Sequence, residues 1–72
     1  MLIIWSKENC SNCVKAKNFL AEKGILYEER KIDNKTWTVT DLLTLIPNAK
    51  SVPQIFDDEV YVGGFNELLN YV

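Results

Sequence analysis

The sequence predicts an α/β fold in which a central four-stranded mixed sheet is flanked by three helices. Three observations support this prediction. Short apolar runs typical of strands alternate with helical patterns in the first half of the chain. Two further strand-like runs follow close together, separated by a turn, and a last helical pattern ends the chain. Because a strand–helix–strand unit implies a parallel crossover, we expect the order β-α-β-α-β-β-α with a hairpin near the end.

The first strand is predicted at residues 2–5, "LIIW", a continuous apolar run such as a central strand shows. After a polar loop, the spacing of apolar residues predicts a helix over residues 11–23, with Cys13 on its apolar face. Gly24 is a natural end for this helix. Residues 25–33, "ILYEERKID", alternate loosely between apolar and polar side chains and predict the second strand.

The second half of the chain contains shorter elements. Thr38 and Asp41 predict a capping box at the start of a short helix, and Pro47 ends that helix. The runs "PQIF" and "EVYV" predict the two strands of a hairpin whose turn lies at residues 57–58. After a pair of glycines, Asn66 is expected to cap the last helix.

Size and composition narrow the classes of protein. We expect one domain, residues 1–72, and 47% of the residues are hydrophobic, as in a folded protein. The net charge is −2 and no basic run occurs, so we expect no nucleic-acid partner. No apolar run approaches the roughly 18 residues that cross a membrane, and the first residues lack the features of a signal peptide. We therefore expect a cytoplasmic protein, without a membrane partner, that works as a monomer.

Cys10 and Cys13 are the only cysteines, and they stand three residues apart at the start of the first predicted helix. Cβ atoms at positions i and i+3 of a helix lie roughly 5–6 Å apart, and a disulfide needs about 3.5–4.5 Å. A modest tightening of the first turn therefore joins the two sulfurs. In a reducing compartment such a pair is more typical of catalysis or metal binding than of a structural disulfide. The spacing favours a redox-active pair.

Position along the helix predicts different roles for the two thiols. Cys10 falls at the N-terminal end, where free backbone N–H groups and the helix dipole favour a thiolate. Lys7, three residues upstream, adds a positive charge near Cys10. Lys15 and Lys17 raise the local positive potential further, and a neighbouring glutamate offsets part of that potential. Cys13 lies on the core-facing side. We therefore predict that Cys10 attacks and Cys13 resolves.

Two other interpretations of the pair are a pair of inert buried cysteines and a metal site. A CxxC spacing directly after an apolar strand argues against the first. Structural zinc takes four ligands, whereas the chain has two cysteines and no histidine, so no metal is expected. A site shared between two chains, or completed by a small thiol, stays open.

Three segments together carry a family resemblance. "WSKENCSNC", "SVPQIF" and "VGGFNELLNYV" occur in this order and resemble the active-site segment, the Val-Pro strand and the Gly-Gly turn of glutaredoxins. The resemblance covers nearly the whole chain. The short length of the chain and its "GGF" turn are most similar to phage-type glutaredoxins, which would work in the host cytoplasm. It implies a thioredoxin-like fold in its compact form.

The resemblance also implies a function, a dithiol–disulfide oxidoreductase. Such a protein reduces protein disulfides or glutathione mixed disulfides, and glutathione re-reduces it as co-substrate. Ribonucleotide reductase is the protein target that the resemblance suggests. An alternative is an NrdH-type redoxin, which thioredoxin reductase reduces. The segment "YVGGFNEL" lacks the Trp and the Arg-Pro pair typical of those redoxins and so favours glutaredoxin.

Particular residues match the family's glutathione site. Pro53 matches the family's cis-proline, and the backbone of Val52 matches the part that pairs with an extended thiol substrate. Lys7 matches the contact to the glycine carboxylate of glutathione. Lys50 lies close to the place of a second such contact, although for this residue a solvated surface lysine is the simpler interpretation.

The Gly-Gly turn matches the part of the family that holds the γ-glutamyl end of glutathione. The resemblance assigns Gly64, Phe65 and Asn66 to this contact. Glu67 stands near the family's aspartate, and an acid in the first turn of a helix is an equally good interpretation of it. Phe65 replaces a small residue and is expected in the core or in a substrate-facing wall.

Ser11 and Asn12 depart from the proline and tyrosine that usually stand between the cysteines of the family. In some glutaredoxins a serine at the first place accompanies an iron–sulfur cluster shared with glutathione. A non-catalytic carrier of a [2Fe-2S] cluster or a metal is therefore a further alternative. The tyrosine forms a wall of the glutathione groove, so its loss implies weaker glutathione binding.

Overall fold

The computed structural model describes residues 1–72 and contains the seven predicted elements in the predicted order. Each differs from its predicted bounds by only a few residues. The elements are β1 (Leu2–Ser6), α1 (Ser11–Glu22), β2 (Tyr27–Lys31), α2 (Val39–Leu45), β3 (Gln54–Asp57), β4 (Val60–Gly63) and α3 (Phe65–Tyr71).

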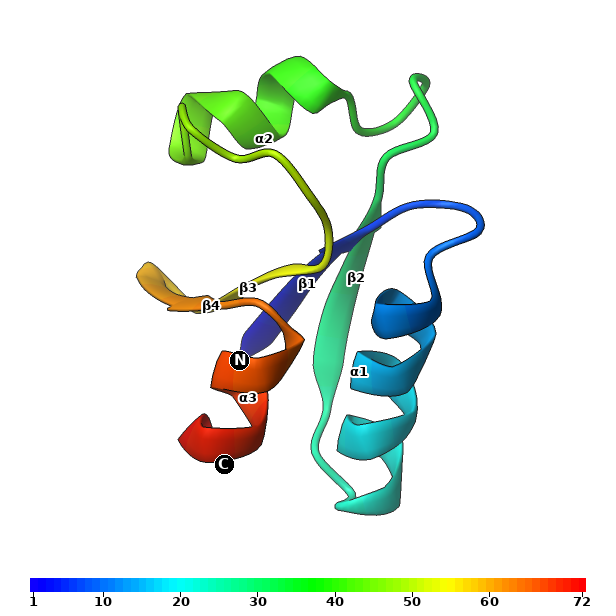
Figure 1. Ribbon diagram of the computed structural model, residues 1–72, viewed down its shortest axis with the longest axis vertical. Coiled ribbons are helices and arrows are strands. Elements are labelled where there is room, and N and C mark those ends of the chain that lie inside the picture. The colour runs from blue at the N-terminus through cyan, green and yellow to red at the C-terminus, as the bar shows by residue number, and fades with distance from the viewer.

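The four strands form one mixed sheet in the order β2-β1-β3-β4 (Figure 1). β1 pairs with β2 in parallel, because α1 carries the chain back between them, and with β3 antiparallel. β3 and β4 form the predicted hairpin. The register places Leu2 beside Tyr27 on one side and Asp57 on the other. The predicted α/β architecture, four strands and three helices, is confirmed.

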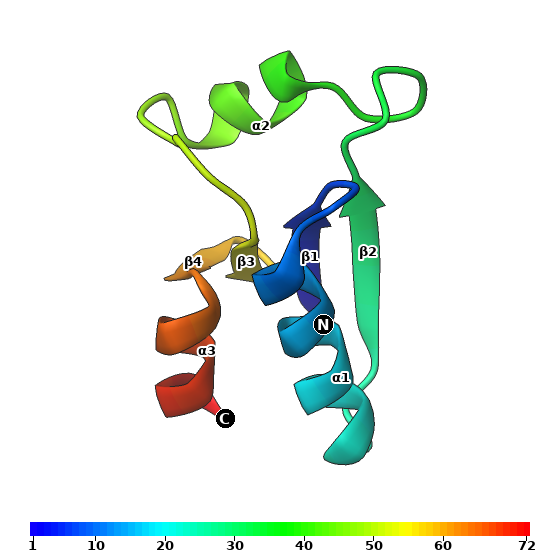
Figure 2. The same cartoon turned by 45° about the vertical axis from the view of Figure 1, so that its right-hand side comes forward.

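Alternating side chains of β1 fill two apolar clusters, one on each face of the sheet. One cluster lies under α1 and α3, whereas α2 lies beyond the ends of β1 and β2 (Figure 2) and contributes one buried residue to the other cluster. Ile4, Leu20 and Leu68 have no exposed surface and join β1 to α1 and α3. Trp5 faces the opposite way and packs with Leu42 of α2. No helix is long and apolar enough to cross a membrane.

The second strand is shorter than predicted at both ends. At its start, Gly24 adopts a φ of +69° and the N–H of Ile25 donates to the carbonyl of Leu20, so these residues close α1 instead of pairing in the sheet. At its end, the carboxylate of Asp33 accepts the backbone N–H groups of residues 35 and 36, each at 2.9 Å. This local turn replaces ladder hydrogen bonds, as aspartate side chains often do.

Helix caps separate a confirmed prediction from a wrong one. The capping box of α2 is present. Thr38 Oγ1 accepts the N–H of Asp41 at 3.2 Å, and the carboxylate of Asp41 accepts the N–H of Thr38 at 2.9 Å. The cap of α3 is Gly64, not Asn66. Glycine has no capping side chain, so the carboxylate of Glu67 reaches back and accepts the Gly64 N–H at 2.8 Å.

Candidate active site

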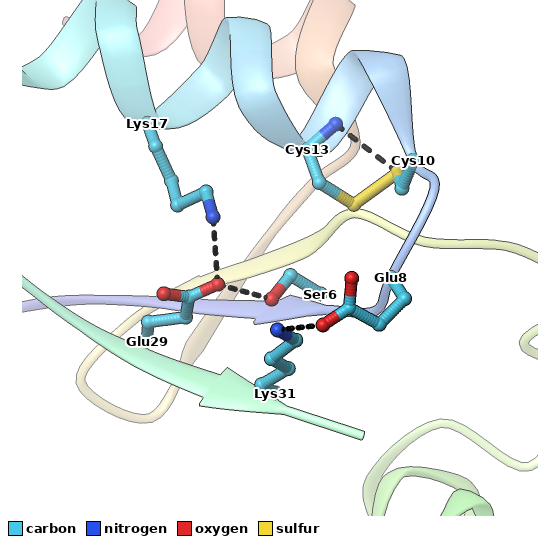
Figure 3. A network of polar contacts seen from close by, with 7 residues as sticks. All are labelled: Ser6, Glu8, Cys10, Cys13, Lys17, Glu29 and Lys31. Atoms are coloured by element: carbon cyan, nitrogen blue, oxygen red, sulfur yellow. Dashed lines mark hydrogen bonds and ion pairs between the residues drawn. A yellow bond between two sulfur atoms is a disulfide. The ribbon is translucent and has the colours of Figure 1, made fainter. Parts of the chain in front are cut away.

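The two cysteines lie at the N-terminal end of α1 and are joined by a disulfide (Figure 3). Cys10 is the N-cap residue, and its Sγ accepts the backbone N–H of Cys13 at 3.1 Å. Once the disulfide is reduced, an N–H group in this position would favour a thiolate over a thiol at Cys10. The helix-end environment that the sequence predicts for Cys10 is therefore present.

The two sulfurs differ in their access to solvent. Cys13 is 1% exposed and lies among the residues of the core, whereas Cys10 is half-buried. Cys10 is therefore the more accessible of the two cysteines.

The loop before β3 lies directly against Cys10. The Val52–Pro53 peptide bond is cis, and Pro53 is buried. The Cys10 Sγ lies 3.6 Å from the carbonyl oxygen of Val52. In the disulfide form this approach is a contact and not a hydrogen bond, because the sulfur carries no proton. The backbone of Val52 is thus beside the sulfur where exchange would take place.

The structure brings together three of the residues that resemble the glutathione site. Lys7, Lys50 and Val52 line one cavity of about 180 Å³. It lies between α2, the segment before β3 and the loop that joins β1 to α1, which we call the cysteine loop. Two lysines and an exposed stretch of backbone are groups that can hold a carboxylate and a peptide. The proximity of Lys50 to Lys7 arises from the fold, because 43 positions of sequence separate them.

The three residues assigned to the γ-glutamyl contact in the Gly-Gly turn lie in different surroundings. Gly64 lies close to the Pro53 loop, so that a Cβ added to Gly64 would stand 3.6 Å from the Pro53 carbonyl oxygen. The side chain of Phe65 packs against the core, and Asn66 is exposed. The carboxylate of Glu67 makes the capping contact to Gly64.

A polar network beside the disulfide was not expected from the sequence. Ser6, which is 1% exposed, donates to Glu29 at 2.6 Å, and the ammonium of Lys17 donates to the same carboxylate oxygen at 2.9 Å (Figure 3). Lys31 pairs with Glu8 in the cysteine loop. One signal was available, since strand alternation places Glu29 on the face of Tyr27, which packs on the core under α1.

The network lowers the pKa of Glu29. Partial burial opposes the negative charge and would raise the pKa. The hydrogen bonds from Ser6 and Lys17, together with the charges of Lys17 and Lys31, outweigh that effect, so the pKa of Glu29 lies below its ordinary value of 4.5. The pKa of Asp33 is also lowered, from 3.8, chiefly because its carboxylate accepts backbone N–H groups of residues 35 and 36.

These two carboxylates predict that stability falls in acid. The folded protein holds their protons less tightly than the unfolded chain does. Their contribution is therefore complete above about pH 5 and is lost as the pH falls through their lowered values. We expect the urea midpoint of unfolding to decrease from about pH 5 to pH 3, and Glu29→Gln to flatten that decrease. Glu59→Gln, at the exposed β3–β4 turn, is the control. An identical pH slope in wild type and Glu29→Gln would contradict this.

The fold and the cysteine pair define a class of protein. A half-buried sulfur at a helix N-cap, bonded to a buried sulfur three residues on, can pass a disulfide to a partner and take it back. On a four-stranded mixed sheet with three helices, this site defines a thiol–disulfide oxidoreductase of thioredoxin-like fold. The glutaredoxin family model matches residues 2–62, and the chain belongs to the glutaredoxin family.

Curated relatives and a solved structure agree with this assignment. Glutaredoxin 1 from Rickettsia prowazekii is 39% identical over 70 residues, which are 96% of this chain and 74% of the relative. Glutaredoxin 3 from Escherichia coli is 34% identical over 65 residues, 90% of this chain and 77% of the relative. The crystal structure of glutaredoxin 1 from Francisella tularensis complexed with cacodylate matches with a TM-score of 0.80 and 29% identity, covering 96% and 87% of the two chains.

Proposed function

We propose that this glutaredoxin reduces disulfides of protein substrates and that glutathione re-reduces it. The accessible Cys10 sulfur beside the buried Cys13 is the observation that carries the proposal. The Cys10 thiolate attacks the target disulfide, forms a mixed disulfide and releases one target thiolate. The Cys13 thiolate then attacks the Cys10 sulfur, which releases the second target thiolate and leaves the internal disulfide. Ribonucleotide reductase is the target that the family resemblance suggests.

Re-reduction consumes two molecules of glutathione. The first glutathione thiolate attacks the Cys10 sulfur, which is the accessible one, and frees Cys13 as a thiolate. The second attacks the sulfur of the bound glutathione, releases Cys10 and leaves as glutathione disulfide. Two thiols are thus oxidised for each protein disulfide reduced. We place this cycle in the cytoplasm, where the glutathione pool is kept reduced.

The cavity beside Val52 supports glutathione as the reductant. Lys7 and Lys50 offer two cations on its wall for the glycine carboxylate, and the Val52 backbone lies 3.6 Å from the Cys10 sulfur that the thiol must reach. Gly64 lies close to the Pro53 carbonyl and is the residue that we assign to the γ-glutamyl end of the tripeptide. A cavity lined by two cations, with the Cys10 sulfur beside a backbone carbonyl of its wall, suits a thiol peptide that carries a terminal carboxylate.

Replacing Lys7 with alanine is expected to weaken glutathione use. The lost contact is exposed and is worth about 1 kcal/mol, which corresponds to about a fivefold higher KM for glutathione. The measurement is the initial rate with a fixed disulfide substrate and varied glutathione. Lys35→Ala, which removes an equal charge away from the cavity, is the control. A KM that rises equally in both variants would show that Lys7 makes no specific contact.

The choice of reductant is tested by running two couplings in parallel. One contains glutathione, glutathione reductase and NADPH, and the other contains thioredoxin reductase and NADPH alone. We expect turnover in the first only. Turnover in the second only would overturn the glutathione proposal and favour the NrdH-type alternative. A brown dimer containing glutathione, purified without oxygen and inactive in both couplings, would instead favour the cluster carrier.

A further inference from the structure

A second and larger cavity lies at the cysteine pair itself. It measures about 540 Å³ and is bounded by the cysteine loop, the first turns of α1 and the end of β2. Cys10 and Cys13 both line it, as do Lys7, Lys17 and Lys31. Lys7 is the one residue that it shares with the cavity assigned above to glutathione. The two cavities thus meet at Lys7, and the cysteines line the larger one.

We propose that this basic cavity binds an acidic residue next to the disulfide of a protein substrate. The inference rests on the proposed function and names its substrate class, protein disulfides flanked by Asp or Glu. A carboxylate held in this cavity lies beside the sulfur that attacks, so its peptide is held with the target disulfide at Cys10.

The charges around the cavity favour an anion. Three lysines line it against one carboxylate, that of Glu8. Lys17 is paired with Glu29 and Lys31 with Glu8, whereas Lys7 makes no ion pair. Including Glu29, the local balance is three positive and two negative charges, in a chain whose net charge is −2. The Lys31–Glu8 pair is exposed on both sides, so a substrate carboxylate can replace Glu8 at little cost.

The opposite end of the molecule is acidic. Asp57, Asp58 and Glu59 stand together at the β3–β4 turn. The register pairs Asp57 with Leu2 at the start of β1, whereas the cysteine loop follows the last residue of that strand. The amino group of Met1 contacts two of these carboxylates and so offsets one of three negative charges. An acidic partner is therefore repelled from this end and turned toward the disulfide.

The test uses disulfide peptides of one sequence whose flanking positions are Asp, Asn or Lys. The protein is reduced with dithiothreitol, freed of it, and mixed with each peptide in a single turnover, so that glutathione plays no part. The expected second-order rate constant is about tenfold higher for the Asp peptide than for the Asn peptide at low salt, and lowest for the Lys peptide. The preference is expected to shrink toward one at about 0.5 M salt.

Charge-removing variants locate the effect. Lys17→Gln combined with Lys31→Gln is expected to bring the ratio of the Asp-peptide rate to the Asn-peptide rate close to one. This ratio cancels any change in the reactivity of Cys10 itself. Lys23→Gln combined with Lys35→Gln removes the same charge from residues outside the cavity and is expected to keep the ratio of wild type. A far-UV circular dichroism spectrum equal to that of wild type shows that each variant is folded.

Failure of the inference differs from failure of the proposed function. Equal rates for the three peptides, with normal reduction of the neutral 2-hydroxyethyl disulfide, overturn only the acidic-substrate proposal. An equal loss of preference in both double variants also overturns it, because the effect would then follow net charge and not this cavity. No reduction of any disulfide would overturn the proposed function itself.

Discussion

Replacing Cys10 with serine is expected to abolish disulfide exchange, lowering the rate by at least about a thousandfold. A serine hydroxyl at the α1 N-cap remains protonated at neutral pH and cannot form the mixed disulfide. The remaining thiol, Cys13, is 1% exposed and cannot meet an incoming disulfide without opening the helix end. The measurement is the glutathione-coupled reduction of a disulfide peptide, compared with the uncatalysed rate.

The matched variant Cys13→Ser separates the two roles. It keeps the accessible thiol but cannot release the target, so we expect a one-to-one mixed disulfide with a substrate peptide, visible by mass spectrometry. Alkylation by iodoacetamide at pH 7 gives an independent readout, since the Cys10-only protein should react faster than the Cys13-only protein. Faster alkylation of the Cys13-only protein would reverse the assignment.

Replacing Gly63 with alanine is expected to destabilise the fold strongly. Gly63 is buried and has a φ of +126°, a conformation that costs other residues about 1–3 kcal/mol. An added Cβ would also stand 2.7 Å from the Cγ and 2.8 Å from the Cβ of Glu67. The Glu67 Cβ is fixed to the backbone of α3, so the helix itself must move, at a further cost of about 1–3 kcal/mol.

A loss of this size is large for a 72-residue chain, whose total stability is about 4–11 kcal/mol. We expect the melting temperature to fall by at least about 10 °C. Gly64→Ala is the matched control, because Gly64 itself has a φ of −95° and the added Cβ would stand 3.3 Å from the flexible end of Glu67. Similar melting temperatures for the two variants would contradict this account of the turn.

The same turn connects stability to the site. Gly64 caps α3 and lies beside the Pro53 loop, and that loop brings the Val52 carbonyl to within 3.6 Å of the Cys10 sulfur. A displaced α3 therefore shifts the loop beside the sulfur. We accordingly expect the folded fraction of Gly63→Ala to reduce disulfides more slowly than wild type, measured per folded molecule.

The order of the elements, the pairing of the cysteines and the capping box of α2 could be predicted from the amino-acid pattern alone. These features are local. Strand runs, helical spacing and a Thr38–Asp41 cap depend on residues within a few positions of one another, so their pattern is visible along the chain. The accessibility of Cys10 and the burial of Cys13 follow from the same helical period.

The contacts that distant residues make around that pair arise from the folded chain and could not be predicted from local pattern. Cys10 and the Val52 carbonyl are 42 positions apart, and Ser6 and Glu29 are 23 positions apart. Both approaches depend on the sheet register, which sets β1 between β2 and β3 and is fixed by packing on both faces. The cap of α3 was also decided there, because Glu67 turns back to the Gly64 N–H and Asn66 is left exposed. Local pattern therefore specified the reactive sulfurs, and long-range register specified the charges and backbone that surround them.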